Sequence, residues 1–296
     1  MNNINRSFSD LSEMETYIAD CEENFFSQVK AASLAICGDK SVKFILLSGP
    51  TCSGKTTTAG KICEELEKAG KNVKVISIDD FYLSRDFING ENIDFESAEA
   101  IDLDYFAECI EKLSAKKPTQ LPVFDFVSGV RTGYVNFTPT DDTIIVFEGI
   151  QALYPEIASL IPSESRKIVF VNVFNDFYAY DRAFTREEIR FWRRMIRDYK
   201  FRGASPDTTL KLWQNVVANE KKNIIPNIPM ADIKIDSFLP YEINVIGRYL
   251  TKEITYDINN KNETLLCDTF RHIFDTIPQI PGELVPSTSV FREFIG

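Results

Sequence analysis

Residues 49–56 read GPTCSGKT and match GxxxxGK[ST], a pattern typical of a loop that binds phosphate groups. Glycines let successive backbone N–H groups turn toward an anion, and the helix that follows presents its positive dipole end to the same anion. Lys55 would reach the terminal phosphates, and the Thr56 hydroxyl would ligate magnesium. Cys52 reads as a small filler without a chemical role. The residues expected to bind the nucleotide in this loop are Gly49, Thr51, Cys52, Ser53, Gly54, Lys55, Thr56 and Thr57.

Two acidic residues follow apolar runs that read as buried strands. Asp79 comes after residues 73–78, and Glu148 comes after residues 144–147. Ligands of an open α/β sheet bind at the carboxyl ends of its strands. A carboxylate there can accept a proton from an attacking hydroxyl or support magnesium, whereas a turn cap is the alternative interpretation for Asp79.

A stripe of arginines on an expected helix is the third feature that could do chemistry. Arg190, Arg193, Arg194 and Arg197 fall within an arc of about 100° on an expected helix, with apolar residues on another face. This pattern predicts guanidiniums free to stabilise a phosphoryl group in transfer, and Arg202 supplies another. The alternative is a solvated helix face paired with neighbouring glutamates.

Together these segments resemble the uridine kinase and phosphoribulokinase-like family of P-loop kinases, over about residues 42–246. The resemblance rests on GPTCSGKTT at 49–57, DDFY at 79–82, DFESAEAID at 94–102, LPVFDFVSGVR at 121–131, FEGIQAL at 147–153, RRMIRDYKFRG at 193–203 and ADIKIDS at 231–237. The segments TTLKLW and PYEINVI look most like the bacterial nucleoside kinase branch, whose members often carry an N-terminal accessory domain.

The resemblance implies roles for individual residues. Asp79 matches the catalytic carboxylate, and Thr56 and Glu148 match magnesium ligands, with Asp79 also near the metal. Lys55, Arg194, Arg197 and Arg202 match groups that hold the transferred phosphoryl or the nucleotide. The residues expected at the phosphate acceptor are Asp79, Tyr82, Glu96, Phe124, Phe126, Arg131 and Arg194, with Glu96 standing where the family usually has an aspartate.

The sequence departs from the nucleoside kinases at residues that contact the base. Phe124 replaces a tyrosine, Gly129 a histidine and Leu212 a glutamine, and a lid arginine appears as Ala204. A site that lacks those hydrogen-bonding groups cannot discriminate a pyrimidine by them. Phe124 and Phe126 could stack on a flat ring, or could be core aromatics.

Alternating strands and helices must position these groups. Expected helices cover residues 8–38, 97–113 (with Ser97 as cap), 185–201, 206–220 and 264–274, with another after Pro240; expected strands cover 44–47, 73–78, 144–147, 168–171 and 232–235. The alternation predicts an α/β fold with a mostly parallel sheet. The resemblance makes this a P-loop kinase fold with a five-stranded sheet and an arginine-bearing lid. We divide the chain into an N-terminal helical extension (1–40), a kinase core (41–240, with the lid at about 185–222) and a C-terminal helical extension (241–296).

The amino-acid composition argues against some classes of function. The net charge of −11 argues against a nucleic-acid partner, and no stretch reaches the roughly 20 apolar residues of a membrane span. The six cysteines form no CxxC pair and favour reduced thiols in the cytoplasm. We expect ATP and Mg²⁺ as cofactors and a small-molecule acceptor, with a nucleoside hydroxyl leading. A sugar phosphate or organic acid acceptor, an ATP-binding regulator without catalysis, and assembly into a homo-oligomer through the terminal segments stay open.

Overall fold

The computed structural model describes residues 5–84 and 97–296. Its centre is a five-stranded sheet in the order β2 (Asn72–Ser77), β5 (Thr143–Glu148), β1 (Phe44–Ser48), β6 (Arg166–Asn172), β9 (Ile233–Asp236). Every neighbouring pair in it is parallel. All five residues of β1 are buried, as expected of a strand covered on both faces. The predicted α/β fold with a five-stranded parallel sheet is therefore confirmed.

Strand register brings the predicted carboxylates to one edge. Glu148, the last residue of β5, lies opposite Leu47 of β1 on one side and Ser77 of β2 on the other. The chain after β1 enters the phosphate loop, and the chain after β2 enters a short 3₁₀ helix, Ile78–Phe81, that carries Asp79. Because parallel strands end together, the loop and both carboxylates share the same edge.

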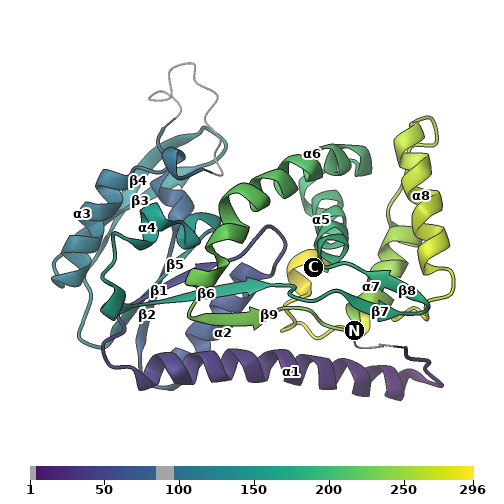
Figure 1. Cartoon of the computed structure of the whole chain (residues 1–296), viewed down its shortest axis with the longest axis horizontal. Coiled ribbons are helices and arrows are strands. Elements are labelled where there is room, and N and C mark those ends of the chain that lie inside the picture. The colour runs from purple at the N-terminus through teal and green to yellow at the C-terminus, as the bar shows by residue number, and fades with distance from the viewer. Residues whose placement is uncertain (1–4, 85–96) are drawn as a thin grey trace.

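Helices cover the two faces with separate cores. Ile45 and Leu47 of β1 point into a core shared with α1 (Leu11–Gly38) and α2 (Lys55–Lys68). Phe44 and Leu46 point into a second core with α3 (Leu103–Ser114) and the short helix α4 (Pro155–Ala158). The alternation follows from the period of two along a strand. Figure 1 shows α1 running along one side of the sheet, and it packs against α2 and β9.

The predicted lid helices form as expected. Helix α5 (Arg186–Arg202) begins with a capping box between Thr185 and Glu188 and ends at Gly203, whose φ of 64° is left-handed. Helix α6 (Pro206–Asn219) begins after Ser205, whose hydroxyl accepts a hydrogen bond from the backbone N–H of Thr208. A small hairpin, β7 (Phe177–Ala179) and β8 (Arg182–Phe184), precedes α5.

Two local predictions need correction. The expected helix 97–113 is a 3₁₀ turn, Ala98–Ala100, followed by α3, and its cap is Asp102, which accepts from the Tyr105 backbone N–H, rather than Ser97. Sequence reasoning also missed the antiparallel hairpin of β3 (Thr119–Asp125) and β4 (Val130–Phe137), which flanks the carboxylate edge.

The C-terminal part completes the first core. It comprises α7 (Glu242–Arg248), α8 (Lys261–Phe274) and α9 (Arg292–Ile295). The segment after α8 folds back, and Val285, Val290 and Phe291 are buried in the core of α1, α2 and α5. The division into three parts stays a prediction. No helix among the described residues is long and apolar enough to cross a bilayer.

Candidate active site

The loop between β1 and α2 has the geometry of a phosphate cradle. A Cβ on Gly49 would lie 2.2 Å from the Val171 carbonyl oxygen and 2.6 Å from Ser53 Oγ, so only glycine fits. Cys52 and Gly54 have left-handed φ values of 56° and 84°. The non-glycine at positive φ marks a backbone held by its surroundings. The loop thus turns twice immediately before the N-terminus of α2.

The polar groups of the loop fit a bound phosphate chain. Ser53 Oγ is fully buried and has no hydrogen-bond partner among the described residues. Lys55 Nζ donates to the carbonyl of Pro50 at 3.3 Å, across the loop. The first backbone N–H groups of α2 have no partner within the helix, and their dipole favours an anion. Thr51, Cys52 and Thr56 belong to the same loop and helix start. The Thr56 hydroxyl and the Glu148 carboxylate offer oxygen atoms of the kind that Mg²⁺ takes as ligands.

The charges of Lys55, Asp79 and Glu148 influence one another. Burial raises the pKa of Asp79, and the Lys55 ammonium and a hydrogen bond with Tyr82 oppose that rise. Burial likewise raises the pKa of Glu148, with Lys55 opposing and Asp79 adding to the rise. The Asp79 backbone N–H donates to Ser77 Oγ at 3.3 Å, which fixes the start of the 3₁₀ helix. The structure therefore brings together the carboxylates and the lysine that the sequence predicted.

Three lid arginines converge on one buried carboxylate. Asp198 accepts from Arg194 Nε at 3.1 Å and from Arg197 Nη2 at 2.7 Å, and Arg202 Nε lies 3.6 Å from it. Asp198 is 3 % exposed, whereas the Arg202 side chain is 59 % exposed. Charge-assisted contacts of this kind hold the guanidiniums together before any ligand arrives.

The prediction of a free arginine stripe is wrong for Arg190 and Arg193. Arg190 pairs with Glu220 through two hydrogen bonds of 2.6 and 2.7 Å, and Arg193 pairs with Glu242 at 2.7 and 2.8 Å. Arg190 is 3 % exposed and Arg193 is fully buried. Both also donate to carbonyls of the phosphate loop, so they support the loop instead of meeting an anion. A buried charge is stable only when it is paired in this way.

Three of the predicted acceptor residues, Tyr82, Phe124 and Phe126, lie on the β3–β4 side of the edge. The rings of Tyr82, Phe124 and Phe126 are mutually packed, with centroids 5.4–6.3 Å apart. Asp80 Oδ1 accepts from the Phe124 backbone N–H at 3.2 Å and ties the hairpin to the 3₁₀ helix. Phe126 is 57 % exposed, so the alternative of a core aromatic does not hold for it. Glu96 lies outside the described residues.

Arg131 occupies a defined position beside this aromatic cluster. Its Nη2 donates to Asp102 Oδ2 at 3.1 Å, and its guanidinium lies over the Tyr105 ring at 4.9 Å. Its Nε is buried and has no partner within residues 5–84 and 97–296. The Asp102 carboxylate and the Tyr105 ring therefore fix the position of the Arg131 guanidinium.

Sequence reasoning missed one residue at the cradle. Glu293 Oε2, from α9, accepts from the Thr57 backbone N–H at 3.2 Å and from Thr57 Oγ1 at 3.0 Å. No motif around residue 293 signals this contact. Thr57 itself was predicted to bind the nucleotide.

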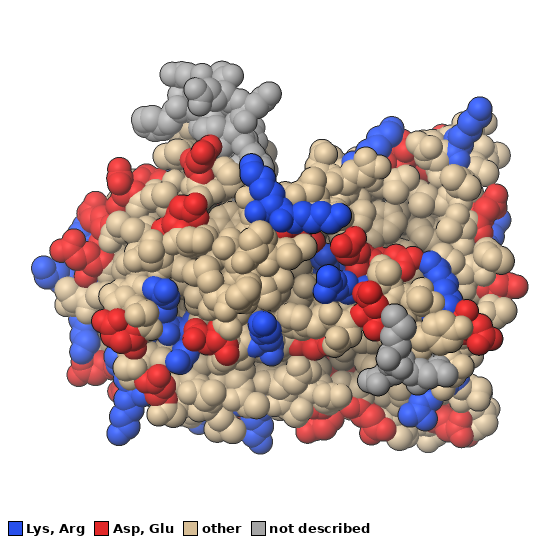
Figure 2. Space-filling view, viewed as in Figure 1, with Lys and Arg blue, Asp and Glu red and all other residues tan. Residues whose placement is uncertain are grey.

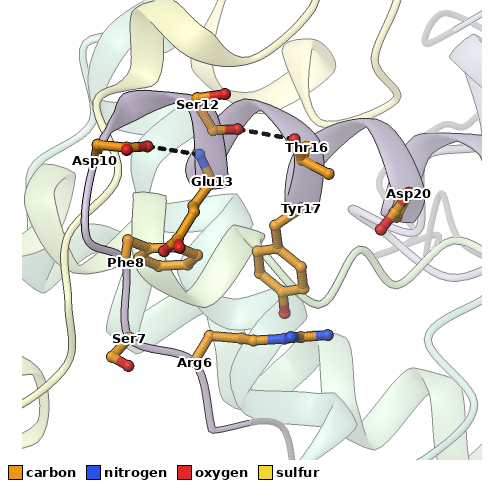
Figure 3. A pocket seen from close by; sticks show the side chains of 9 residues that line it. All are labelled: Arg6, Ser7, Phe8, Asp10, Ser12, Glu13, Thr16, Tyr17 and Asp20. Atoms are coloured by element: carbon orange, nitrogen blue, oxygen red, sulfur yellow. Dashed lines mark hydrogen bonds between the residues drawn. The ribbon is translucent and has the colours of Figure 1, made fainter.

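The surface carries a hollow at its upper edge and a pocket at the start of α1. Figure 2 shows a hollow at the upper edge, between the part that carries α3 and the part that carries α6 and α8, with Lys and Arg side chains along it. A separate pocket of about 450 Å³ lies where residues 6–8 fold back against α1. Figure 3 shows Arg6 against the Tyr17 ring there, 5.2 Å from its centroid. None of the predicted site residues lines this pocket.

A phosphate cradle between β1 of a parallel sheet and the helix α2 that follows it, with a lysine and two carboxylates at the same edge, defines a P-loop nucleotide-binding protein. The family model described as "Phosphoribulokinase / Uridine kinase family" matches residues 44–243, and the chain belongs to this family.

Relatives in three organisms are similar to the chain. It is 29% identical to a uridine kinase of Schizosaccharomyces pombe over 86% of this chain and 55% of that protein. It is 27% identical to uridine-cytidine kinase C of Dictyostelium discoideum over 81% of this chain and 51% of that protein. It is 26% identical to inorganic pyrophosphatase TTM2 of Arabidopsis thaliana over 80% of this chain and 35% of that protein. The chain spans about half or less of the length of these relatives.

Proposed function

We propose that the protein transfers the γ-phosphoryl group of ATP to a hydroxyl of a small molecule, with a nucleoside as the leading acceptor. The observation that carries the proposal is the convergence of Lys55, Asp79 and Glu148 on the edge where the loop enters α2. A phosphate cradle alone would serve a regulator equally well. A buried carboxylate beside it gives the site a base for an attacking hydroxyl.

Each group has a chemical role in this proposal. Asp79 accepts the proton as the acceptor oxygen forms its bond to phosphorus and ADP leaves with the broken P–O bond. Its raised pKa makes it a stronger base than an exposed aspartate. Lys55, Arg194 and Arg197 hold the transferred group and offset its charge. Thr56, Glu148 and Asp79 would hold magnesium, which supplies further neutralisation of the phosphate oxygens.

The surroundings of Arg131 favour a neutral acceptor over an anionic one. Asp102 already pairs with this guanidinium, so its charge is largely compensated before a ligand binds. A sugar phosphate or organic acid would need that charge. The exposed Phe126 ring, which packs against the buried rings of Tyr82 and Phe124, offers an apolar face to a flat base instead.

A panel of acceptors tests the proposal. Purified protein would be mixed with ATP, magnesium and one of several nucleosides, sugar alcohols, sugar phosphates, organic acids or water alone, and ADP release followed. Inorganic pyrophosphate would be tested as a hydrolysis substrate, given the pyrophosphatase among the relatives. We expect stimulation by a nucleoside. Stimulation only by an anionic acceptor would favour the sugar phosphate or organic acid alternative, and tight ATP binding with no stimulation would favour a regulator.

A further inference from the structure

Glu293 occupies a position where a P-loop binds phosphate. Its carboxylate accepts from the backbone N–H and the hydroxyl of Thr57, in the first turn of the 14-residue helix α2. Backbone N–H groups in this turn are the donors that a P-loop offers to a nucleotide's phosphates. A carboxylate satisfies them with the same charge sign and the same oxygen chemistry as a phosphate.

The charges around Glu293 are those of the catalytic edge. The Glu293 carboxylate contributes to raising the pKa of Glu148 and to raising that of Arg197 in the lid. The carboxylate therefore lies among the loop, the predicted magnesium ligand and the lid arginine, the groups that should surround a triphosphate. A triphosphate bound among these groups and the Glu293 carboxylate would repel each other, because both are negatively charged.

The backbone that carries Glu293 is firmly docked. Within residues 286–296, which we call the C-terminal segment, Phe291, Phe294 and Ile295 are buried, and Ser289 Oγ lies 2.9 Å from Tyr241 Oη. Val290 Cγ2 would lie 2.5 Å from a Cβ on Gly54. Undocking this segment would expose several large apolar side chains. Rotation of the Glu293 side chain exposes none of them and clears the Thr57 donors.

The C-terminal segment also contacts the lid. Lys200 Nζ, on α5, donates to the Ile295 carbonyl, and the Arg193 guanidinium lies over the Phe294 ring at 5.0 Å. Helices α5 and α9 pack against each other. A movement of α5 on nucleotide binding would therefore be transmitted to the helix that carries Glu293.

We propose that Glu293 is a built-in competitor for the nucleotide's phosphates: its carboxylate holds the Thr57 donors when no nucleotide is bound and must rotate away when a triphosphate enters. This inference rests on the proposed nucleotide site. It makes Glu293 a residue that lowers the affinity for ATP, rather than a ligand of ATP or magnesium.

Binding measurements on Glu293→Gln and Glu293→Ala test the inference, with ATP, inorganic triphosphate and adenosine as probes in calorimetry. In the unchanged protein a triphosphate must break the hydrogen bonds between Thr57 and the charged Glu293, a contact worth ~1.5–3 kcal/mol. Both variants weaken or remove that contact, so we expect ATP and inorganic triphosphate to bind about 10- to 100-fold more tightly. Adenosine, which has no phosphate, should bind as it does to the unchanged protein. Glu283→Gln is the matched control, because Glu283 is an exposed glutamate shortly before the C-terminal segment.

The possible outcomes separate the inference from the proposed function. Equal or weaker ATP binding by both Glu293 variants, with the unchanged protein binding ATP, would overturn the role of Glu293 alone. If neither the unchanged protein nor either variant binds ATP or inorganic triphosphate, the proposed nucleotide site is overturned, and the inference falls with it. An equal gain in affinity for adenosine would also contradict a role for Glu293 as a competitor of phosphate. Thermal unfolding of each variant checks that the C-terminal segment stays docked.

Discussion

Arg193 and Glu242 form an ion pair in which neither side chain exposes any surface to solvent. Arg193 Nε and Nη2 donate to the two carboxylate oxygens at 2.7 and 2.8 Å. The remaining guanidinium donors reach the carbonyls of Cys52 and Ser237. One buried pair thus joins the lid helix α5, the phosphate loop and α7, and the shape of the cradle depends on it.

Arg193→Met should destabilise the fold strongly. It leaves the Glu242 carboxylate buried without its partner, at a cost of about 3–5 kcal/mol in the free energy of unfolding. Urea-induced unfolding followed by circular dichroism measures the change. The matched control is Arg248→Met, which breaks an exposed pair with Glu253 and should cost less than about 1 kcal/mol. Equal losses in the two variants would contradict a structural role for Arg193.

Asp79→Asn should abolish most of the turnover and leave ATP binding nearly intact. An amide cannot accept the acceptor's proton, and loss of general-base catalysis typically costs about 10²–10⁴-fold in rate. Steady-state kinetics and ATP calorimetry on the same sample measure both. Asp80→Asn is the control, because an amide oxygen can still accept from the Phe124 N–H. A parallel loss of ATP affinity in Asp79→Asn would assign Asp79 to nucleotide or metal binding instead.

Asp102→Asn should change which acceptors are used. It removes the carboxylate that compensates Arg131, so the guanidinium gains net charge toward a ligand. We expect the KM of anionic acceptors to fall by about tenfold, the scale of one charge-assisted contact, while the KM of ATP stays the same. The acceptor panel measures this. If Arg131→Ala leaves every acceptor's KM unchanged, Arg131 does not contact the acceptor.

The buried cysteines should react slowly with thiol reagents. All six cysteines are free thiols. Burial raises the pKa of Cys21, Cys63 and Cys109 to about 11, and it raises the pKa of Cys52 in the phosphate loop. A raised thiol pKa leaves less thiolate at neutral pH, so alkylation should accelerate as the pH rises toward the pKa.

Mass spectrometry after brief alkylation locates the labelled residues. We expect the half-buried Cys37 to label first, and all six cysteines to label after unfolding in denaturant. Fast labelling of Cys52 in the folded protein at neutral pH would contradict its role as an inert filler of the loop.

The sequence predicted those parts of the fold and site that depend on local patterns. The strand 44–47, the loop of residues 49–56 and the helix after it carry their signal within about 25 consecutive residues. Carboxylates at strand ends follow from the parallel sheet, so Asp79 and Glu148 were placed at the same edge. The lid helices α5 and α6 were predicted because apolar residues recur at helical spacing along them and capping residues precede them.

The remaining features depend on distant partners. Arg190 and Arg193 looked available to anions because Glu220 and Glu242 come 30 and 49 positions later in the chain. Glu293 lies 236 positions from Thr57. The β3–β4 hairpin was missed because Pro122 interrupts β3 and no residue of β4 is buried, which weakens the alternation that marks a strand.

Equilibrium binding of ATP in the presence of magnesium tests the central claim most directly. Calorimetry on the purified protein should show saturable binding at one site. Lys55→Ala should weaken it by about tenfold or more, since Lys55 contributes a charge-assisted contact to the phosphates. Circular dichroism would show that Lys55→Ala is folded. No binding by the unchanged protein, or binding that Lys55→Ala leaves unaltered, would contradict the account.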